Sequence, residues 1–320
     1  MPSWRVSDMQ TMSQVEAFGH TLLELGEIFE NVLVLDMDVS NSTKTGYFEE
    51  AFPERFIQIG ISEQDGIGVA AGLAMSGKIP IISGFAFFLI GRGWEQITNT
   101  VASQSLNVKI VGTHSGLSPY ADGGSHQMLS DIAITRVIPG MTVVVPADAS
   151  STKVLLKESV RRYGPVYLRL VRGAPPVLYQ DDIELEIGEA NIVREGSDVT
   201  IAGAGVPLSF ALEASRKLKE MGIDTDILDL HTVKPMDTKA LLDSARKTGA
   251  IITVEEHNIL GGLGGSVAEV LSENYPIPLK RVGVNDMFGE SSRNLQSLYD
   301  KHNLTTDAVV EAVLDVMERK

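Results

Sequence analysis

The chain of 320 residues contains no cysteine, so disulfides, thiolate metal sites and cysteine nucleophiles are all excluded. Basic residues are also scarce: 27 Lys and Arg stand against 42 Asp and Glu, which gives a formal net charge of −15. This excess of acid disfavours nucleic acids and anionic membrane surfaces as partners. An anionic substrate would therefore need a local cationic pocket.

Long apolar runs are missing as well. The longest uncharged apolar run covers residues 79–91 and is shorter than the about 20 residues of a membrane-spanning helix. The first residues lack the basic segment followed by an apolar one that is typical of a secretory signal. We therefore expect a cytoplasmic protein that does not bind membranes.

The sequence does contain short apolar strand-like runs that alternate with helix-like segments. The strand-like runs cover residues 31–38, 78–87, 108–115, 142–147 and 165–171, and helix-like segments lie between them. Near-continuous apolar strands separated by helices are typical of a parallel sheet that is covered on both faces.

This regularity stops after Arg172, and a second series of strands and helices begins near residue 199 and closes with a helix from about Thr305. The prediction is an α/β fold with two consecutive doubly wound, mainly parallel-sheet domains. We place the first domain at residues 1–175, a linker rich in Pro, Gly and acid at 176–190, and the second domain at 191–320.

One loop, GTHSGLSPYADGGSHQ (residues 112–127), holds two of the six histidines, His114 and His126, with Asp122 between them. Its glycines and proline indicate an irregular segment. It follows a predicted strand, and in open parallel sheets ligands bind at the carboxyl ends of the strands. The sequence therefore predicts a polar site at this loop, and the spacing is a poor match to zinc patterns.

Several other residues that follow predicted strands have two interpretations each when they are judged from the sequence alone. Glu63 opens a helix, where it either stabilises the helix dipole or carries chemistry. Phe85 and Phe88 are either core residues or a platform for a flat cofactor ring. Arg169 and Arg172 alternate with apolar residues, and one of them is expected to pair with a surface acid. The glycine motifs at 203–208 and 261–265 indicate tight turns into helices.

Five segments resemble the transketolase family, and the likeness covers nearly the whole chain. They are LDMDVSNST, GISEQDGIGVAAGLA, THSGLSPYADGGSHQ, IPGMTVVVPAD and EEHNILGGLGGSVAE. The resemblance implies a thiamine-diphosphate pyrimidine-binding domain followed by the transketolase C-terminal domain, which carries no cofactor.

The resemblance also implies roles for individual residues. Glu63 would hydrogen-bond the aminopyrimidine of thiamine diphosphate and promote deprotonation of the cofactor. Phe85 and Phe88 would flank the pyrimidine, and Val39, just after Asp38, would support the bent cofactor.

For the sugar, Asp122 and His126 would act with Glu63 as catalytic residues by orienting the hydroxyl and carbonyl of a donor ketose. An anionic end group of the sugar would be bound by His114, Ser42 and Arg172, with Arg92 as a further cation.

The family binds the diphosphate and Mg²⁺ through a GDG motif, and no GDG occurs in this chain. The resemblance therefore implies the carboxy-terminal subunit of a split transketolase, which moves a two-carbon ketol unit from a ketose to an aldose. The chain would be inactive alone. It would work with a separate N-terminal-type subunit that carries the GDG motif, in an α₂β₂ assembly in which this chain also self-associates.

One departure concerns the substrate. Val15 stands where the family has an arginine that binds phosphate, so the partner, Arg92 or Lys44 replaces it, or the end group is not an ordinary sugar phosphate. A sulfonated sugar or a branched sugar phosphate would fit. Three alternatives stay open: the beta subunit of a 2-oxo acid dehydrogenase-type decarboxylase, an enzyme like deoxyxylulose-phosphate synthase, and a non-catalytic paralogue.

Overall fold

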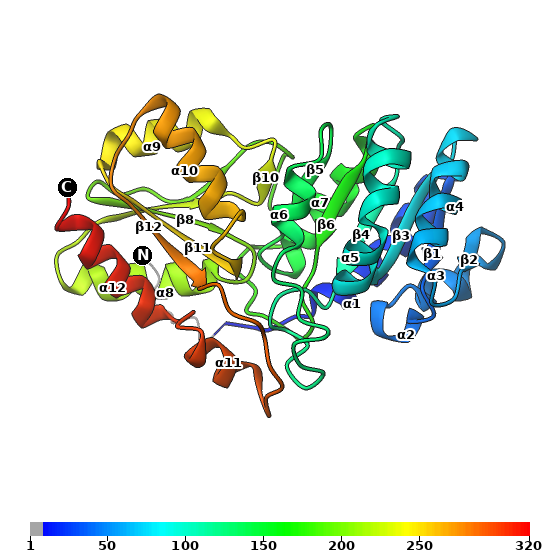
Figure 1. Cartoon of the computed structure of the whole chain (residues 1–320), viewed down its shortest axis with the longest axis horizontal. Helices are drawn as coiled ribbons and strands as arrows, with labels where there is room; N and C mark the ends of the chain where they lie inside the picture. The colour runs from blue at the N-terminus through cyan, green and yellow to red at the C-terminus, as the bar shows by residue number, and fades with distance from the viewer. Residues whose placement is uncertain (1–8) are drawn as a thin grey trace.

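The computed structural model describes residues 9–320 as two α/β units that lie side by side (Figure 1). The first unit is built on a seven-stranded sheet in the order β10-β5-β6-β4-β3-β1-β2. Its strands are β1 (Val32–Asp36), β2 (Phe56–Gln58), β3 (Ile79–Phe85), β4 (Lys109–Thr113), β5 (Thr142–Val144), β6 (Val166–Arg169) and β10 (Thr232–Lys234). All neighbours are parallel except β10 and β5.

The second unit is built on a five-stranded sheet in the order β12-β11-β8-β9-β7. Its strands are β7 (Asn191–Arg194), β8 (Val199–Ala204), β9 (Thr225–Asp229), β11 (Ile251–Asn258) and β12 (Leu279–Val284). Only β7 is antiparallel to its neighbour. The predicted fold class, two consecutive mainly parallel α/β domains, is confirmed, while the exact domain boundaries stay a prediction.

Helices cover both sheets (Figure 1). Those of the first unit are α1 (Gln14–Ile28), α2 (Ser40–Thr43), α3 (Gly46–Ala51), α4 (Glu63–Met75), α5 (Ala86–Gln96), α6 (Asp131–Arg136) and α7 (Ala149–Arg161), together with a 3₁₀ helix, η2 (Pro53–Arg55), and a π-helix, η3 (Ile97–Ala102). Those of the second are α8 (Leu208–Glu220), α9 (Thr238–Thr248), α10 (Leu263–Asn274), α11 (Leu295–Lys301) and α12 (Thr306–Met317). No helix within residues 9–320 has both the length and the apolarity to cross a bilayer.

The structure differs from the sequence prediction at three elements. The expected strand at 78–87 ends at Phe85, and Ala86 begins α5, because a short apolar run does not distinguish a strand from a buried helix. The run after residue 224 forms two strands rather than one, and the second, β10, joins the first sheet. Strand β7 was not expected, since it lies in a stretch that is rich in charge and glycine.

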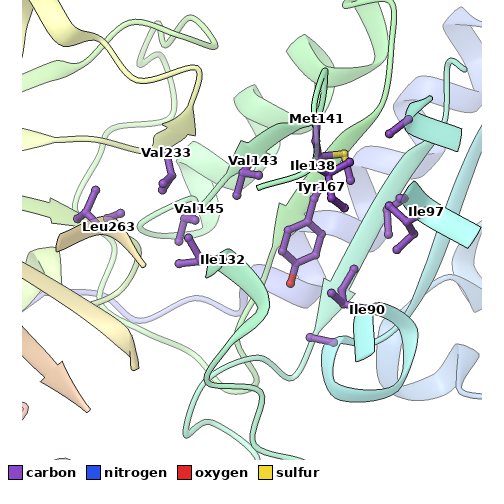
Figure 2. Packing of buried hydrophobic residues seen from close by; sticks show 14 of the residues in the cluster. Ile90, Ile97, Ile132, Ile138, Met141, Val143, Val145, Tyr167, Val233 and Leu263 are labelled. Atoms are coloured by element: carbon purple, nitrogen blue, oxygen red, sulfur yellow. The ribbon is translucent and has the colours of Figure 1, made fainter. Parts of the chain in front are cut away.

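A single hydrophobic cluster crosses from one unit to the other (Figure 2). Val143 and Val145 from the β5 region face Val233 of β10 and Leu263, the first residue of α10. Apolar side chains from both units are buried in one core, and this burial stabilises the placement of the two units relative to each other. The stabilisation is roughly 25 cal/mol per Å² of apolar area removed from water. The two units therefore form one body, with the loop at 112–127 at their junction.

Asp148 holds the connecting segment against the first unit. It is fully buried and caps α7 through Ser151, while its Oδ2 accepts from the backbone N–H groups of Leu178 and Tyr179 at 2.7 and 2.8 Å. Asp148→Ala should lower the free energy of unfolding by roughly 3–5 kcal/mol, because it leaves several buried donors without an acceptor. Urea unfolding of the full chain measures this change.

A suitable control is Thr305→Ala, which removes one cap bond, to Ala308 N at 3.2 Å, and should lower the free energy of unfolding by only about 1 kcal/mol. Equal losses in the two variants would contradict the role given to Asp148.

Candidate active site

Glu63 is the first residue of α4 and is 5% exposed. A carboxylate at this end of a helix is stabilised by the positive end of the helix dipole. Its Oε2 lies 3.3 Å from Nη1 of Arg92, whose side chain comes from α5 and is 56% exposed. The carboxyl group is therefore buried, with an exposed cation beside it.

Two phenylalanines and two histidines pack together next to this carboxyl group. Phe85 ends β3, and its ring centroid lies 4.3 Å from that of His114, just after β4. Phe88, in the first turn of α5, lies 5.0 Å from His126 in an edge-to-face arrangement. The guanidinium of Arg92 lies 4.7 Å above the ring of Phe88. The structure thus brings together predicted residues from α4, β3, α5 and the polar loop.

His114 begins the polar loop in a left-handed backbone conformation, with φ of +54°. Its Nδ1 lies 3.0 Å from Oγ1 of Thr113. Burial lowers the pKa of His114 to about 4, and the charge of Arg172 acts in the same direction, against the opposing effect of Asp122. The imidazole is therefore neutral at pH 7, so it can form hydrogen bonds but carries no positive charge.

Asp122 and Arg172 form an ion pair across the loop, with Oδ2 and Nη1 2.9 Å apart and both side chains more than 40% exposed. The predicted pairing of one arginine with a surface acid therefore concerns Arg172. At the far end of the loop, Nδ1 of His126 lies 3.0 Å from Oγ of Ser125.

The residues after β1 lie at the same edge of the sheet but are held by other groups. Asp38 is exposed with φ of +63°, and its N–H donates to Gln58 Oε1 at 2.8 Å. Val39 is half-buried and packs on the core. Ser42 is exposed on α2, and within residues 9–320 no hydrogen bond joins it to the polar loop.

Val15 lies in α1 and is 4% exposed. The next residue, Glu16, pairs with Lys44 at 3.0 Å. Lys44, one of the two cations that could replace an arginine at position 15, therefore already has an acidic partner, as does Arg92.

The sequence reasoning missed a buried polar network where the two units meet. Arg169 donates from Nε to Asp131 Oδ2 at 2.8 Å and from Nη2 to the carbonyl of Glu256 at 2.8 Å. Tyr167 donates to the same Asp131 oxygen at 2.6 Å. Charged residues inside otherwise apolar strands, as in the AIITVEEH run, were the available signal.

The comparisons with known proteins agree with the two-domain fold. Residues 10–176 match the transketolase pyrimidine-binding domain, and residues 188–309 match the transketolase C-terminal domain. Together the two domains define a class of enzymes whose family implies dependence on thiamine diphosphate. The chain belongs to the transketolase family.

Among the similar proteins, a solved structure described as a split gene transketolase, inactive beta4 tetramer, is 46% identical. It has a TM-score of 0.90 and covers 97% of this chain and 100% of its own. A subunit of the 6-deoxy-6-sulfo-D-fructose transketolase of Clostridium sp. is 41% identical over 95% of this chain and 94% of its own length. A subunit of the apulose-4-phosphate transketolase of Phocaeicola vulgatus is 38% identical over 95% and 97%.

The residues present fit the pyrimidine end of thiamine diphosphate. Phe85 and Phe88 are half-buried aromatic rings on which a flat ligand can pack, and the buried carboxyl group of Glu63 is linked to Phe88 through Arg92. Residues 9–320 contain no cluster of three or more His, Cys, Asp or Glu side chains that could hold a metal ion.

The pKa of His114 gives a direct test of the loop geometry. Because the pKa is about 4 in the folded chain and about 6.5 in an unfolded one, the unfolded state binds more protons between these values. Stability contributed by the neutral imidazole is present above pH 6.5 and falls as the pH drops toward 4. NMR titration should show a His114 midpoint near 4, with the resonance assigned by its loss in His114→Asn. A midpoint at 6 or above would contradict the buried placement.

Proposed function

We propose that this chain is the pyrimidine-binding subunit of a split transketolase and that Glu63, Asp122 and His126 act in the transfer of a two-carbon ketol unit. The observation that carries the proposal is the packing of Phe85 and Phe88 on His114 and His126 at one edge of the first sheet, with Arg92 lying between Phe88 and the buried Glu63. Two relatives that match over almost their whole length are named as transketolase subunits.

The likeness to the transketolase family gives each residue a proposed role. Bound thiamine diphosphate supplies the carbon nucleophile of the reaction. Glu63 hydrogen-bonds a ring nitrogen of the pyrimidine, Phe85 and Phe88 pack on the ring, and Val39 with Asp38 supports the cofactor from the end of β1.

The sugar is held by the polar loop. Asp122 and His126 bind the hydroxyl and carbonyl groups of the donor ketose. The anionic end group of the sugar is bound by His114, Ser42, Arg172 and Arg92.

The diphosphate and Mg²⁺ belong, in this proposal, to a separate subunit with the GDG motif. The similar structure titled an inactive beta4 tetramer supports the view that such a chain self-associates and needs a partner for activity. We propose an α₂β₂ heterotetramer. The cytoplasmic location stays a prediction.

The sugar that we propose carries a sulfonate or a branched, phosphorylated skeleton. Val15 is apolar and buried where the family arginine is expected, and two relatives are named for a sulfonated fructose and for apulose 4-phosphate. Arg172 is then the main cation for the end group. The alternatives, a 2-oxo acid decarboxylase subunit or a deoxyxylulose-phosphate synthase, have less support, because these relatives of matching length are named as transketolase subunits.

Mixing experiments test the proposed function. The chain and a GDG-containing partner, with thiamine diphosphate and Mg²⁺, should transfer a two-carbon unit only when both chains are present. Glu63→Gln should lower kcat by roughly 10²–10⁴-fold, because proton transfer in the cofactor loses its carboxyl group. Asp65→Asn, an exposed carboxylate in the same helical turn, is the matched control and should keep full activity. Transfer by this chain alone, or decarboxylation of a 2-oxo acid without ketol transfer, would refute the proposal.

Arg172→Ala tests the end-group site. Losing a charged hydrogen bond to an anion should weaken binding by about 1.5–3 kcal/mol. The KM for phosphorylated or sulfonated ketoses should therefore rise about 10- to 150-fold, while the KM for an uncharged ketose stays within a factor of about two. Steady-state kinetics on both classes of donor measure the difference. An equal rise for the uncharged sugar would place Arg172 away from the end group.

A further inference from the structure

The first half of the polar loop that carries the donor-binding residues is buried to an unusual degree for an irregular segment. Residues 111–119 are all buried, although regular strand structure ends at Thr113. A buried loop needs partners for its backbone N–H and C=O groups, since an unpaired buried group is costly. The source of these partners shows what holds the loop in place.

Part of the loop is held by the first unit itself. The N–H of Ser115 donates to the carbonyl of Leu170 at 3.1 Å, and the N–H of Gly116 donates to that of Met128 at 2.9 Å. The N–H of Leu117, at the innermost point of the loop, has its acceptor in the second unit instead. It donates to Oε1 of Glu256, on β11, at 2.8 Å.

The side chain of Leu117 also contacts the second unit. It is fully buried in the hydrophobic cluster of the second unit, together with Val254 of β11 and Tyr299 of α11. At Gly116, with φ of +63°, a Cβ would lie 2.6 Å from Cδ of Glu256, so the carboxyl group rests directly against the loop backbone. The middle of the loop is thus inserted into the second unit.

A second contact supports the other half of the loop. Gln127 donates from Nε2 to the carbonyl of Glu290 at 2.9 Å, and the N–H of Ser292 donates to the carbonyl of Tyr120 at 2.8 Å. Hydrogen bonds to the second unit therefore reach the loop within a few residues of both His114 and His126. In the proposed function, this second unit carries no cofactor-binding residue.

We propose that Glu256 is a positioning residue for donor binding: its carboxylate fixes the polar loop so that His114 and His126 keep their places beside Phe85 and Phe88, and Asp122 its place beside Arg172. This inference deepens the proposed function and rests on it for the identity of the ligand. The placement of the loop by Glu256 concerns this chain alone.

The chain supplies a matched control in the neighbouring residue. Glu255 is 1% exposed and Glu256 is 2% exposed, and burial raises the pKa of both to about 7. Alternate strand residues face opposite sides of a sheet. Glu255 accepts from the N–H groups of Leu263 and Gly264 at 2.7 and 2.8 Å, at the start of α10. It therefore caps a helix of its own unit, whereas Glu256 reaches the loop.

The experiment compares Glu256→Ala, Glu256→Gln and Glu255→Ala. Hydrogen exchange is measured on the full chain, and donor and acceptor KM and kcat are measured on the complex with the GDG partner. Both alanine variants should lose stability. Glu256→Ala alone should speed exchange of residues 114–127 at least tenfold and raise donor KM about tenfold, with kcat and acceptor KM nearly unchanged. Glu256→Gln keeps an oxygen acceptor for Leu117 N and should restore both.

Each result has one meaning. Equal loop exchange and equal donor KM in the two alanine variants would overturn the positioning role and leave Glu256 as an ordinary structural carboxyl group. No ketol transfer by the wild-type complex would instead overturn the proposed function, and the exchange data would still decide whether Glu256 holds the loop.

If Glu256→Ala fails to fold, Glu256→Asp replaces it, because the side chain shortened by one methylene group draws its carboxylate back from the N–H of Leu117. This variant should raise loop exchange and donor KM in the same way. Unchanged values of both quantities would overturn the proposal.

Discussion

The ion pair between Arg169 and Asp131 is the contact on which the arrangement of this molecule depends. The two side chains are 3% and 0% exposed, and the arginine also donates to the carbonyl of Glu256 in the second unit. Removing one partner of such a pair leaves an uncompensated buried charge and costs about 3–5 kcal/mol. Because Asp131 begins α6, directly after the polar loop, and Arg169 ends β6, the pair joins the loop, the first sheet and the second unit at one point.

Backbone strain marks the same edge of the first sheet. Asp38 and His114 follow β1 and β4 in the left-handed conformation, with φ of +63° and +54°. Such positions cost of order 1–3 kcal/mol in non-glycine residues and persist only where the surroundings fix them. The packing of Phe85 on His114 and the bonds that bury the loop supply the fixing interactions.

Most of the fold could be predicted from the sequence, since apolar runs and helical segments follow one another with clear turns between them. The strand β10 could not, because its pairing with β5 depends on residues about 90 positions apart and periodicity reports only local structure. The candidate residues at the strand ends could also be named from local sequence, whereas the packing of His114 on Phe85 and the contact between Leu117 and Glu256 are long-range. The two adjacent glutamates in an apolar strand were a visible signal, but their partners lay in other segments.

Because the net charge is −15, the acidic partners of the arginines at the site are important. Arg92 and Arg172 each have an acidic partner, Glu63 and Asp122, at 3.3 and 2.9 Å. A guanidinium has five N–H donors in a planar fork, and the bond from Arg172 to Asp122 uses its Nη1 group. In the proposed function, the remaining N–H groups of Arg172 would bind an anionic end group while Asp122 keeps the arginine in place against the acidic field of the chain. Charge recognition and hydroxyl recognition would then come from one pair of side chains.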